Sequence, residues 1–379
     1  MVTQDHDAAT RLPARRPWLP ELDDSTWRCA QLLGRPVLHG DEVQELRAMV
    51  QGLDAPRWQA LARRAVSRRT APWVLGHIRS LGLAVDPLAR QLLDQGEREA
   101  VQRTLECDQM LFRLAPTLLE GADPACMVLK GRAIEGRAYP AGVMRPMVDV
   151  DLLVRPGQRI RVRQALEVLG LRRTWRSRSG HIAMWSAERG AGAVEVHERP
   201  LCPFRFAPMA ADTAMAGLNA RAVRGPNGWL EPDPIDHTAF LLIHLLEYIY
   251  ADMRHLADLA LWLRAVRPDP ERVVDRLREW QGLAAGAAAA RSVATWDPEA
   301  VDPALLRMAT AQAPGRGPQR WVAAGLRTYA GARVRWTARP HGQWLEAAGL
   351  MAHLDRPWRW LASWTPLGPG MTIPKESED

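Results

Sequence analysis

The stretch CMVLKGRAIEGRAYPAGVMRPMVDVDLLV, residues 126–154, decides the fold of this chain. It begins with an apolar run that predicts a buried strand. It then turns at Lys130 and Gly131 and enters a short helix that ends at YPAG. The run MVDVDLLV alternates between apolar and polar residues, so Asp149 and Asp151 share one face of a second strand. The stretch therefore predicts two strands joined by a glycine turn and a helix, with paired carboxylates on the second strand.

The residues that follow predict the remainder of a small sheet. Pro156 is expected to start the helix QRIRVRQALEVLG, and LRRTWRS, HIAMWSA and AVEVHERP predict three further strands. The last of these strands carries Glu195 and, two residues later on the same face, His197. We expect a unit with strands of mixed direction, in which a third carboxylate lies near the first two.

Helical patterns flank this unit on both sides. Apolar residues recur at three- and four-residue spacing before it, with Asp86 and Pro87 as a helix start, and DHTAFLLIHLLEYIYADMRHLADLALWLRAV predicts a buried helical pair after it. The expected fold class is α+β, a small mixed-sheet core flanked by N-terminal and C-terminal helical domains. We expect a flexible tail at 1–22, a helical region at 23–121, the core at 122–206, a helical domain at 207–366 and a second flexible tail at 367–379.

The composition restricts the class of protein. Hydrophobic residues make up 47% and charged residues 25%, as in ordinary globular chains. No apolar run approaches the roughly 18–20 residues that a membrane span needs. The first residues lack the apolar region of a signal peptide, so we expect a cytoplasmic protein without a membrane partner. The four cysteines form no CxxC pair, which favours free thiols over a disulfide or zinc role.

The basic charge has two interpretations. A net charge of +7 suits a polyanionic partner or a mild excess of arginine over the whole surface. Residues 155–178 contain eight arginines and one acid, and they form either a surface that steers a polyanion or a solvated face. The five tryptophans from Trp336 to Trp364 predict an amphipathic docking face or, alternatively, a membrane or nucleic-acid contact. Nucleic acid is therefore a partner that the sequence allows but does not favour.

The carboxylates and the glycine turn suggest a chemistry. Two carboxylates on one strand face, Asp149 and Asp151, can bridge two divalent cations, and Glu195 can complete one shell and accept a proton from the nucleophile. Lys130 and Gly131 offer an ammonium and backbone N–H groups to a triphosphate. Lys130 is one of only two lysines in the chain, which suggests that a compact ammonium is needed there. These are the parts of a site for nucleotidyl transfer.

The same residues carry a family resemblance. The patterns LKG, YP, RP and DVDLLV, followed by EVH, resemble the uncharacterised bacterial nucleotidyltransferase family of the DNA polymerase β-like superfamily over residues 126–201. A weaker similarity extends to HLLEYIYADMRHLADLALWL. The resemblance implies a minimal nucleotidyltransferase fold, Mg²⁺ and an NTP donor. It also implies that Asp149, Asp151 and Glu195 form the metal-binding triad and that Gly131 is the phosphate-turn glycine. Arg132 stands where the superfamily usually has serine.

Three further side chains have open roles. Arg145 precedes the carboxylate strand and either clamps a phosphate or is one more surface arginine. Arg254 either faces the cleft and touches the nucleotide, or forms a structural ion pair with Asp258 four residues later. His197 either orients a ligand or hydrogen-bonds to Glu195, and we favour the hydrogen bond.

The expected activity is Mg²⁺-dependent transfer of an NMP from an NTP, with two Mg²⁺ ions, ATP as the donor and release of pyrophosphate. The expected acceptor is a small molecule, a peptide or a protein. Two alternatives remain. The protein is an RNA-modifying enzyme of the tRNA-end type, or it is a non-catalytic nucleotide- or partner-binding protein on a decayed nucleotidyltransferase fold. The sequence leaves the oligomeric state open.

Overall fold

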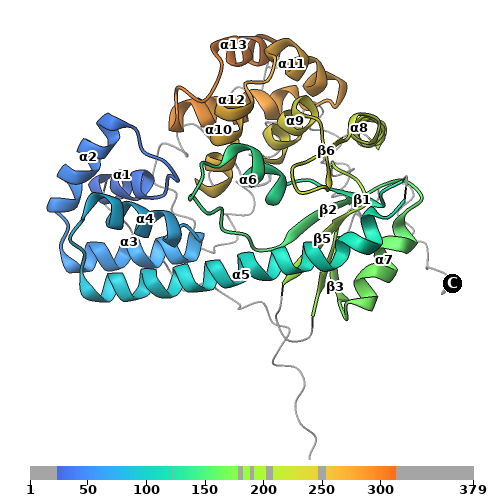
Figure 1. The fold of residues 1–379 in the computed structure, drawn as a ribbon. Helices are drawn as coiled ribbons and strands as arrows, with labels where there is room; N and C mark the ends of the chain where they lie inside the picture. Colours follow the sequence, from blue (N-terminus) through green and yellow to red (C-terminus); the bar gives the residue numbers. More distant parts are fainter. Residues whose placement is uncertain are drawn as a thin grey trace, which may run out of the picture.

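The computed structural model describes residues 24–121, 123–177, 182–187, 192–201, 208–245 and 253–312. Within these ranges it contains thirteen helices and a seven-stranded mixed sheet, which confirms the predicted α+β class (Figure 1). Both predicted tails and the five C-terminal tryptophans lie outside the described residues. The predicted domain boundaries stay predictions. No described helix is long and apolar enough to cross a membrane.

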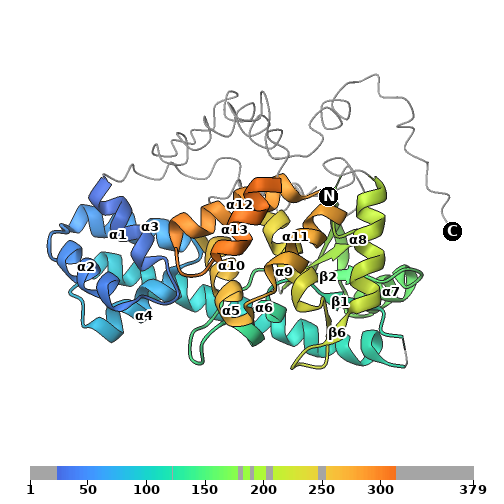
Figure 2. The ribbon, with the colours of Figure 1, turned by 90° about the horizontal axis from the view of Figure 1, so that it is seen from above.

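The N-terminal part of the described chain, α1 to α5, is a helical bundle that ends in one long helix. Helix α5 begins after Asp86, whose carboxylate accepts a hydrogen bond from the Ala89 amide at 3.0 Å, as its pairing with Pro87 predicts. From the bundle α5 runs to the sheet, so the bundle, the C-terminal helices and the sheet lie along it (Figures 1 and 2). The helices are α1 Asp24–Leu33, α2 Gly40–Gln51, α3 Ala55–Arg68, α4 Ala71–Leu81 and α5 Pro87–Leu119.

The sheet has the strand order β3-β4-β5-β2-β1-β7-β6. Its pairs β2–β5 and β1–β7 are parallel and the others are antiparallel, which confirms the mixed directions. The strands are β1 Cys126–Val128, β2 Val150–Val154, β3 Arg172–Arg176, β4 Ile182–Ser186, β5 Ala193–His197, β6 Val223–Arg224 and β7 Leu230–Glu231. Because β2 and β5 are adjacent, the two acid-bearing strands of the sequence lie side by side.

Helices cover the two faces of the sheet unequally. One face packs on α5 and α7 through a cluster that includes Leu114, Leu166, Val150, Trp185 and Val196. The C-terminal helices cover the other face over β1 and β2 (Figure 1). The remaining helices are α6 Arg132–Ala138, α7 Arg159–Val168, α8 Pro208–Arg221, α9 Pro234–His244, α10 Met253–Val266, α11 Pro270–Glu279, α12 Leu283–Trp296 and α13 Pro303–Gln312.

Two element starts differ from the sequence-based expectation. Helix α7 begins at Arg159 rather than at Pro156, because Pro156 and Gly157 form a turn in which Gly157 has a φ of 79° and the Gln158 amide donates to the Arg155 carbonyl at 3.0 Å. Strand β2 begins at Val150, so Asp149 lies one residue before the strand.

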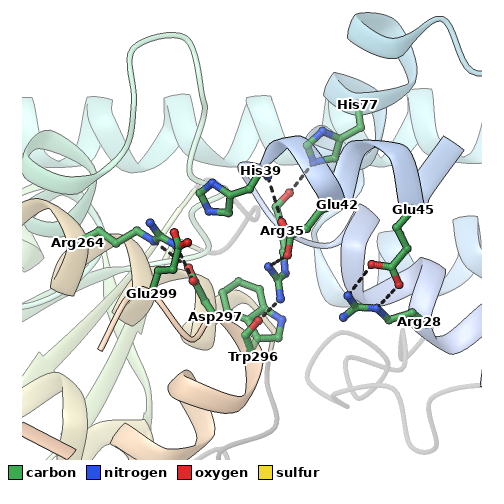
Figure 3. Close-up of polar contacts among 10 residues, drawn as sticks. All are labelled: Arg28, Arg35, His39, Glu42, Glu45, His77, Arg264, Trp296, Asp297 and Glu299. Atoms are coloured by element: carbon green, nitrogen blue, oxygen red, sulfur yellow. Dashed lines mark hydrogen bonds and ion pairs between the residues drawn. The ribbon is translucent and has the colours of Figure 1, made fainter. Parts of the chain in front are cut away.

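Arginine contacts join the N-terminal bundle to the C-terminal helices (Figure 3). The Arg35 guanidinium lies 4.8 Å from the ring centroid of Trp296, donates to the Trp296 carbonyl and pairs with Glu42. At the same end of α12, Arg264 donates to Asp297 at 2.6 and 3.0 Å. The side chain of Arg35, which is almost fully buried, therefore joins the bundle to the end of α12.

Candidate active site

The centre of the site is formed by two neighbouring strands of the sheet. Asp151 of β2 pairs in register with Glu195 of β5, so their side chains leave the same face next to each other. His197 lies two residues further along β5, on that face. One ligand atom from each of these three residues lies within 4.8 Å of the others. The alternation of side chains along the two strands, together with their parallel pairing, thus assembles this group.

His197 lies between the two carboxylates. Its Nε2 is 3.2 Å from Asp151 Oδ1 and 3.2 Å from Glu195 Oε1. Burial alone would lower the pKa of His197, but the hydrogen bonds to Asp151 and Glu195 outweigh burial and raise it to about 9. The ring therefore carries positive charge at neutral pH and offsets part of the charge of the carboxylates. The preferred sequence-based interpretation included the bond to Glu195 but missed the bond to Asp151.

The three acids differ in how readily they ionise. Burial and then the charge of Asp151 raise the pKa of Asp149 to about 6. Burial would also raise the pKa values of Asp151 and Glu195, but Lys130 and His197 lower both. Asp149 is close enough for its pKa to respond to Asp151, Lys130 and Glu195. A bound cation would stabilise the negative charge of these three carboxylates.

Lys130 follows β1 and is directed at this group. Its side chain is buried, and its Nζ lies 2.7 Å from Asp151 Oδ1 and 3.2 Å from Nε2 of His244, at the end of α9. The ammonium thus contacts a candidate metal ligand directly. Sequence reasoning placed Lys130 at the phosphates, and it offered no signal for the contact with His244, which is 114 residues away.

Gly131 makes the turn between β1 and α6. Its φ of 57° and ψ of −109° are unfavourable for a residue with a side chain. An added Cβ would lie 3.4 Å from Met147 Cε and 3.8 Å from Arg145 Nη1. The next residue, Arg132, pairs with Asp108 of α5 and with Glu135, so its side chain anchors α6 to the long helix. The residue in place of the usual serine therefore has a structural contact.

A buried ion pair fixes Arg145 beside this turn. Its Nε and Nη2 donate to Asp258 of α10 at 2.8 and 2.7 Å, and the Tyr139 hydroxyl donates to the same carboxylate at 2.7 Å. Since Nε and Nη2 bind Asp258, it is Nη1 that faces Gly131. Asp258 thus forms a bidentate pair with Arg145, a partner 113 residues away that helical spacing does not reveal. Arg254 lies near the carboxylates, since its charge lowers the pKa of Asp149.

The donor set fits a hard divalent cation. Carboxylate oxygens are the protein ligands that Mg²⁺ takes, and Asp151 and Glu195 present theirs together, with Asp149 adjacent. His197 lies in the same group, and its protonated ring acts there as a hydrogen-bond donor to the carboxylates. The glycine turn and Arg145 lie beside it, on the β1 side. A phosphate-bearing ligand can therefore meet both a metal and a guanidinium here.

The fold is α+β, with a group of carboxylates on one face of its mixed sheet. Residues 54–296 match the model of a family described as "Uncharacterised nucleotidyltransferase". The chain belongs to this family, which confirms the family that residues 126–201 suggested. No curated protein and no solved structure is significantly similar to it.

Proposed function

We propose that this protein is a Mg²⁺-dependent enzyme that transfers an NMP from an NTP to an acceptor and releases pyrophosphate. The observation that carries the proposal is the convergence of Asp151, Glu195 and His197 from two parallel strands, beside the turn at Gly131. Membership of the nucleotidyltransferase family supports the class of reaction. ATP is the expected donor.

The proposed roles combine the assignment made from the sequence with the contacts of these side chains in the structure. Asp149 and Asp151 would hold two Mg²⁺ ions, with Glu195 completing the shell of one. When bound, these ions neutralise charge on the phosphates and lower the pKa of the attacking group. The chain's own groups on the donor side are Gly131, which brings the backbone near the phosphates, and Arg145, whose Nη1 faces that turn. Lys130 and Arg254 add positive charge near the carboxylates.

The reaction forms one bond and breaks one. An oxygen or nitrogen of the acceptor attacks the α-phosphorus of the NTP, and the bond from that phosphorus to the bridging oxygen breaks. Pyrophosphate leaves with the bonding electrons, and the proton of the acceptor passes to Glu195 and then to solvent. The expected acceptor from sequence is a small molecule, a peptide or a protein, and the end of an RNA is the second candidate. Its support is the arginine-rich edge strand β3 with an exposed tryptophan, Trp175.

Incubation of the full chain with Mg²⁺ and each α-labelled NTP, together with pools of candidate acceptors, tests the proposal. The wild type should transfer the label and release pyrophosphate, while Asp151→Asn and Glu195→Gln should lose at least 100-fold in rate. Phe112→Ala, a change at an exposed residue of α5, is the matched control and should keep full activity. Equal labelling by wild type and Asp151→Asn would refute the mechanism.

The non-catalytic alternative predicts a different result. A nucleotide-binding protein on a decayed fold would bind an NTP with Mg²⁺ and release no pyrophosphate with any acceptor. Its biological activity would also survive Asp149→Asn. Calorimetric binding of a non-hydrolysable NTP, measured beside pyrophosphate release, separates this alternative from the enzyme.

A further inference from the structure

Lys130 contacts two side chains that come from different parts of the fold. Its Nζ lies 2.7 Å from Oδ1 of Asp151 on the sheet and 3.2 Å from Nε2 of His244, the last residue of α9. All three residues are less than a tenth exposed. A lysine ammonium lies at the end of a flexible four-carbon stem, so one contact alone would leave its position poorly defined. The sheet and α9 together fix where this ammonium lies.

The contact with His244 has one chemical interpretation. An ammonium has three N–H donors and no acceptor, so Nε2 of His244 must accept the hydrogen bond. The imidazole ring is then neutral and carries its own proton on Nδ1. This second contact of Lys130 therefore adds no negative charge to a site that already has the carboxylates of Asp149, Asp151 and Glu195.

The His244 ring is held in place by two other rings. It stacks on Phe240, four residues earlier in α9, with ring centroids 5.5 Å apart and planes at 14°. It also lies edge-on to His255 of α10, at 5.9 Å between centroids. Burial and the charge of Arg254 lower the pKa of His255 well below its usual value, so this second ring is neutral as well. Packing between α9 and α10 thus sets the orientation of the nitrogen that faces Lys130.

The space beside His244 is too small for a substrate. Within the part of the chain that the structure describes, the adjoining cavity is lined by Lys130, His255, Asp258 and apolar side chains and has a volume of about 10 Å³. A cavity of this size holds no more than one water molecule. A nucleotide does not reach the ring through it, so His244 acts on the site through Lys130.

The same two helices hold both cations beside the glycine turn. Helix α9 contacts Lys130 through His244, and α10 binds Arg145 through Asp258 at 2.7 and 2.8 Å. Lys130 directly precedes Gly131, and Nη1 of Arg145 faces it. The C-terminal helices therefore determine where the positive charges of the donor side lie.

We infer that His244 is the positioning residue of Lys130 and that, through this contact, helix α9 sets the affinity of the site for a nucleoside triphosphate. The inference rests on the proposed function, because it assigns a role on the donor side of the same site. In that function the phosphates bind beside the metal ligands, where an ammonium fixed at Asp151 meets their negative charge. Without the His244 acceptor, the flexible side chain must be ordered when the phosphates bind, which weakens binding.

Nitrogen NMR of the full chain, labelled with ¹⁵N-histidine and free of ligands, tests the contact itself. The signal of His244 is assigned by its loss in His244→Phe. We expect a neutral ring with the proton on Nδ1, and we expect its signal to change in Lys130→Met, where Nε2 loses its donor. A proton on Nε2 in the wild type, or a ring signal that Lys130→Met leaves unchanged, would overturn the inference.

Calorimetry with Mg²⁺ and α,β-methylene NTPs tests the effect on binding, using the nucleotide that the wild type binds most tightly. His244→Phe keeps a ring that can stack on Phe240 but removes the acceptor. It should raise the Kd about tenfold or more, as loss of a hydrogen bond to a charged group predicts. His244→Gln should restore most of the affinity, because its amide oxygen can accept in place of Nε2. Thr238→Val removes the acceptor of a Trp262 hydrogen bond in the same helix and, as the matched control, should leave the Kd unchanged.

A double variant separates positioning from a general structural role. If His244 acts through Lys130, His244→Phe should change the Kd by less than about twofold in a Lys130→Met background, because the two effects are not independent. A residue that only stabilises the fold would weaken NTP binding by the same factor in both backgrounds. That result would overturn the positioning role.

The outcomes also separate this inference from the proposed function. Equal NTP affinity of the wild type and His244→Phe, together with release of pyrophosphate by the wild type, would overturn the role of His244 and leave the transferase standing. If the wild type binds no NTP with Mg²⁺, the proposed function fails. The role of His244 in NTP binding then fails with it, even where the histidine signal confirms the contact with Lys130.

Discussion

The buried pair of Arg145 and Asp258 gives the sharpest test of how the site is held. Both side chains are less than a tenth exposed, and Asp258 accepts three hydrogen bonds, two from Arg145 and one from the Tyr139 hydroxyl. Asp258→Ala leaves a buried guanidinium without its carboxylate and the hydroxyl without its acceptor. Removing one partner of a buried pair costs about 3–5 kcal/mol. We expect the free energy of unfolding to fall by that amount in urea denaturation.

A double variant separates stability from catalysis. Replacing both partners by apolar residues of similar volume is often neutral for stability, so Arg145→Met with Asp258→Leu should recover most of the loss. It should still transfer NMP at least tenfold more slowly than the wild type, because Nη1 of Arg145 no longer faces Gly131. A double variant as unstable as Asp258→Ala would refute the energetic argument. Full activity of the double variant would refute the role of Arg145.

Three further changes test other parts of the structure. Gly131→Ala should destabilise by about 1–3 kcal/mol and raise the KM for the NTP, because alanine is strained at a φ of 57° and a ψ of −109°, and Gly142→Ala, at an open turn, is its control for backbone strain alone. Mg²⁺ should raise the melting temperature of the wild type but not of Asp151→Asn, as scanning fluorimetry would show. Burial lowers the pKa of His237 from 6.5 to about 3. Between these two pH values the unfolded chain therefore binds more protons than the folded chain. Stability should fall as the pH drops through this window, by up to roughly 1.4 kcal/mol per pH unit. His237→Phe should flatten that dependence in urea titrations, and an equal slope in both proteins would count against it.

The sequence predicted the parts of the site that depend on strand periodicity. Asp151, Glu195 and His197 lie where alternation placed them, because a strand presents every second residue to one face and the parallel pairing of β2 with β5 brings the acids into register. Asp149 followed the same pattern in the sequence, but it precedes the strand, and its side chain is not among the three that converge within 4.8 Å.

The parts that the sequence missed depend on tertiary packing. Helical spacing suggested Arg254 as the partner of Asp258, whereas the structure gives Asp258 a bidentate contact with Arg145, which lies before the strand and 113 residues away. Lys130 likewise reaches His244 across 114 residues. Such pairs are set by how α9 and α10 pack on the sheet, and no local pattern encodes them.

The residue that follows the glycine turn has a structural contact in this protein. Arg132, in place of the usual serine, is held by Asp108 and Glu135 and ties α6 to α5. A serine hydroxyl at this position would offer one neutral hydrogen bond to a phosphate, whereas the Arg145 guanidinium beside Gly131 offers a charged one, which is roughly twice as strong. Since Asp258 and Tyr139 fix that guanidinium before any ligand binds, little side-chain entropy is lost when a phosphate arrives. An arginine at position 132 is therefore compatible with phosphate binding, provided that Arg145 keeps its buried carboxylate partner.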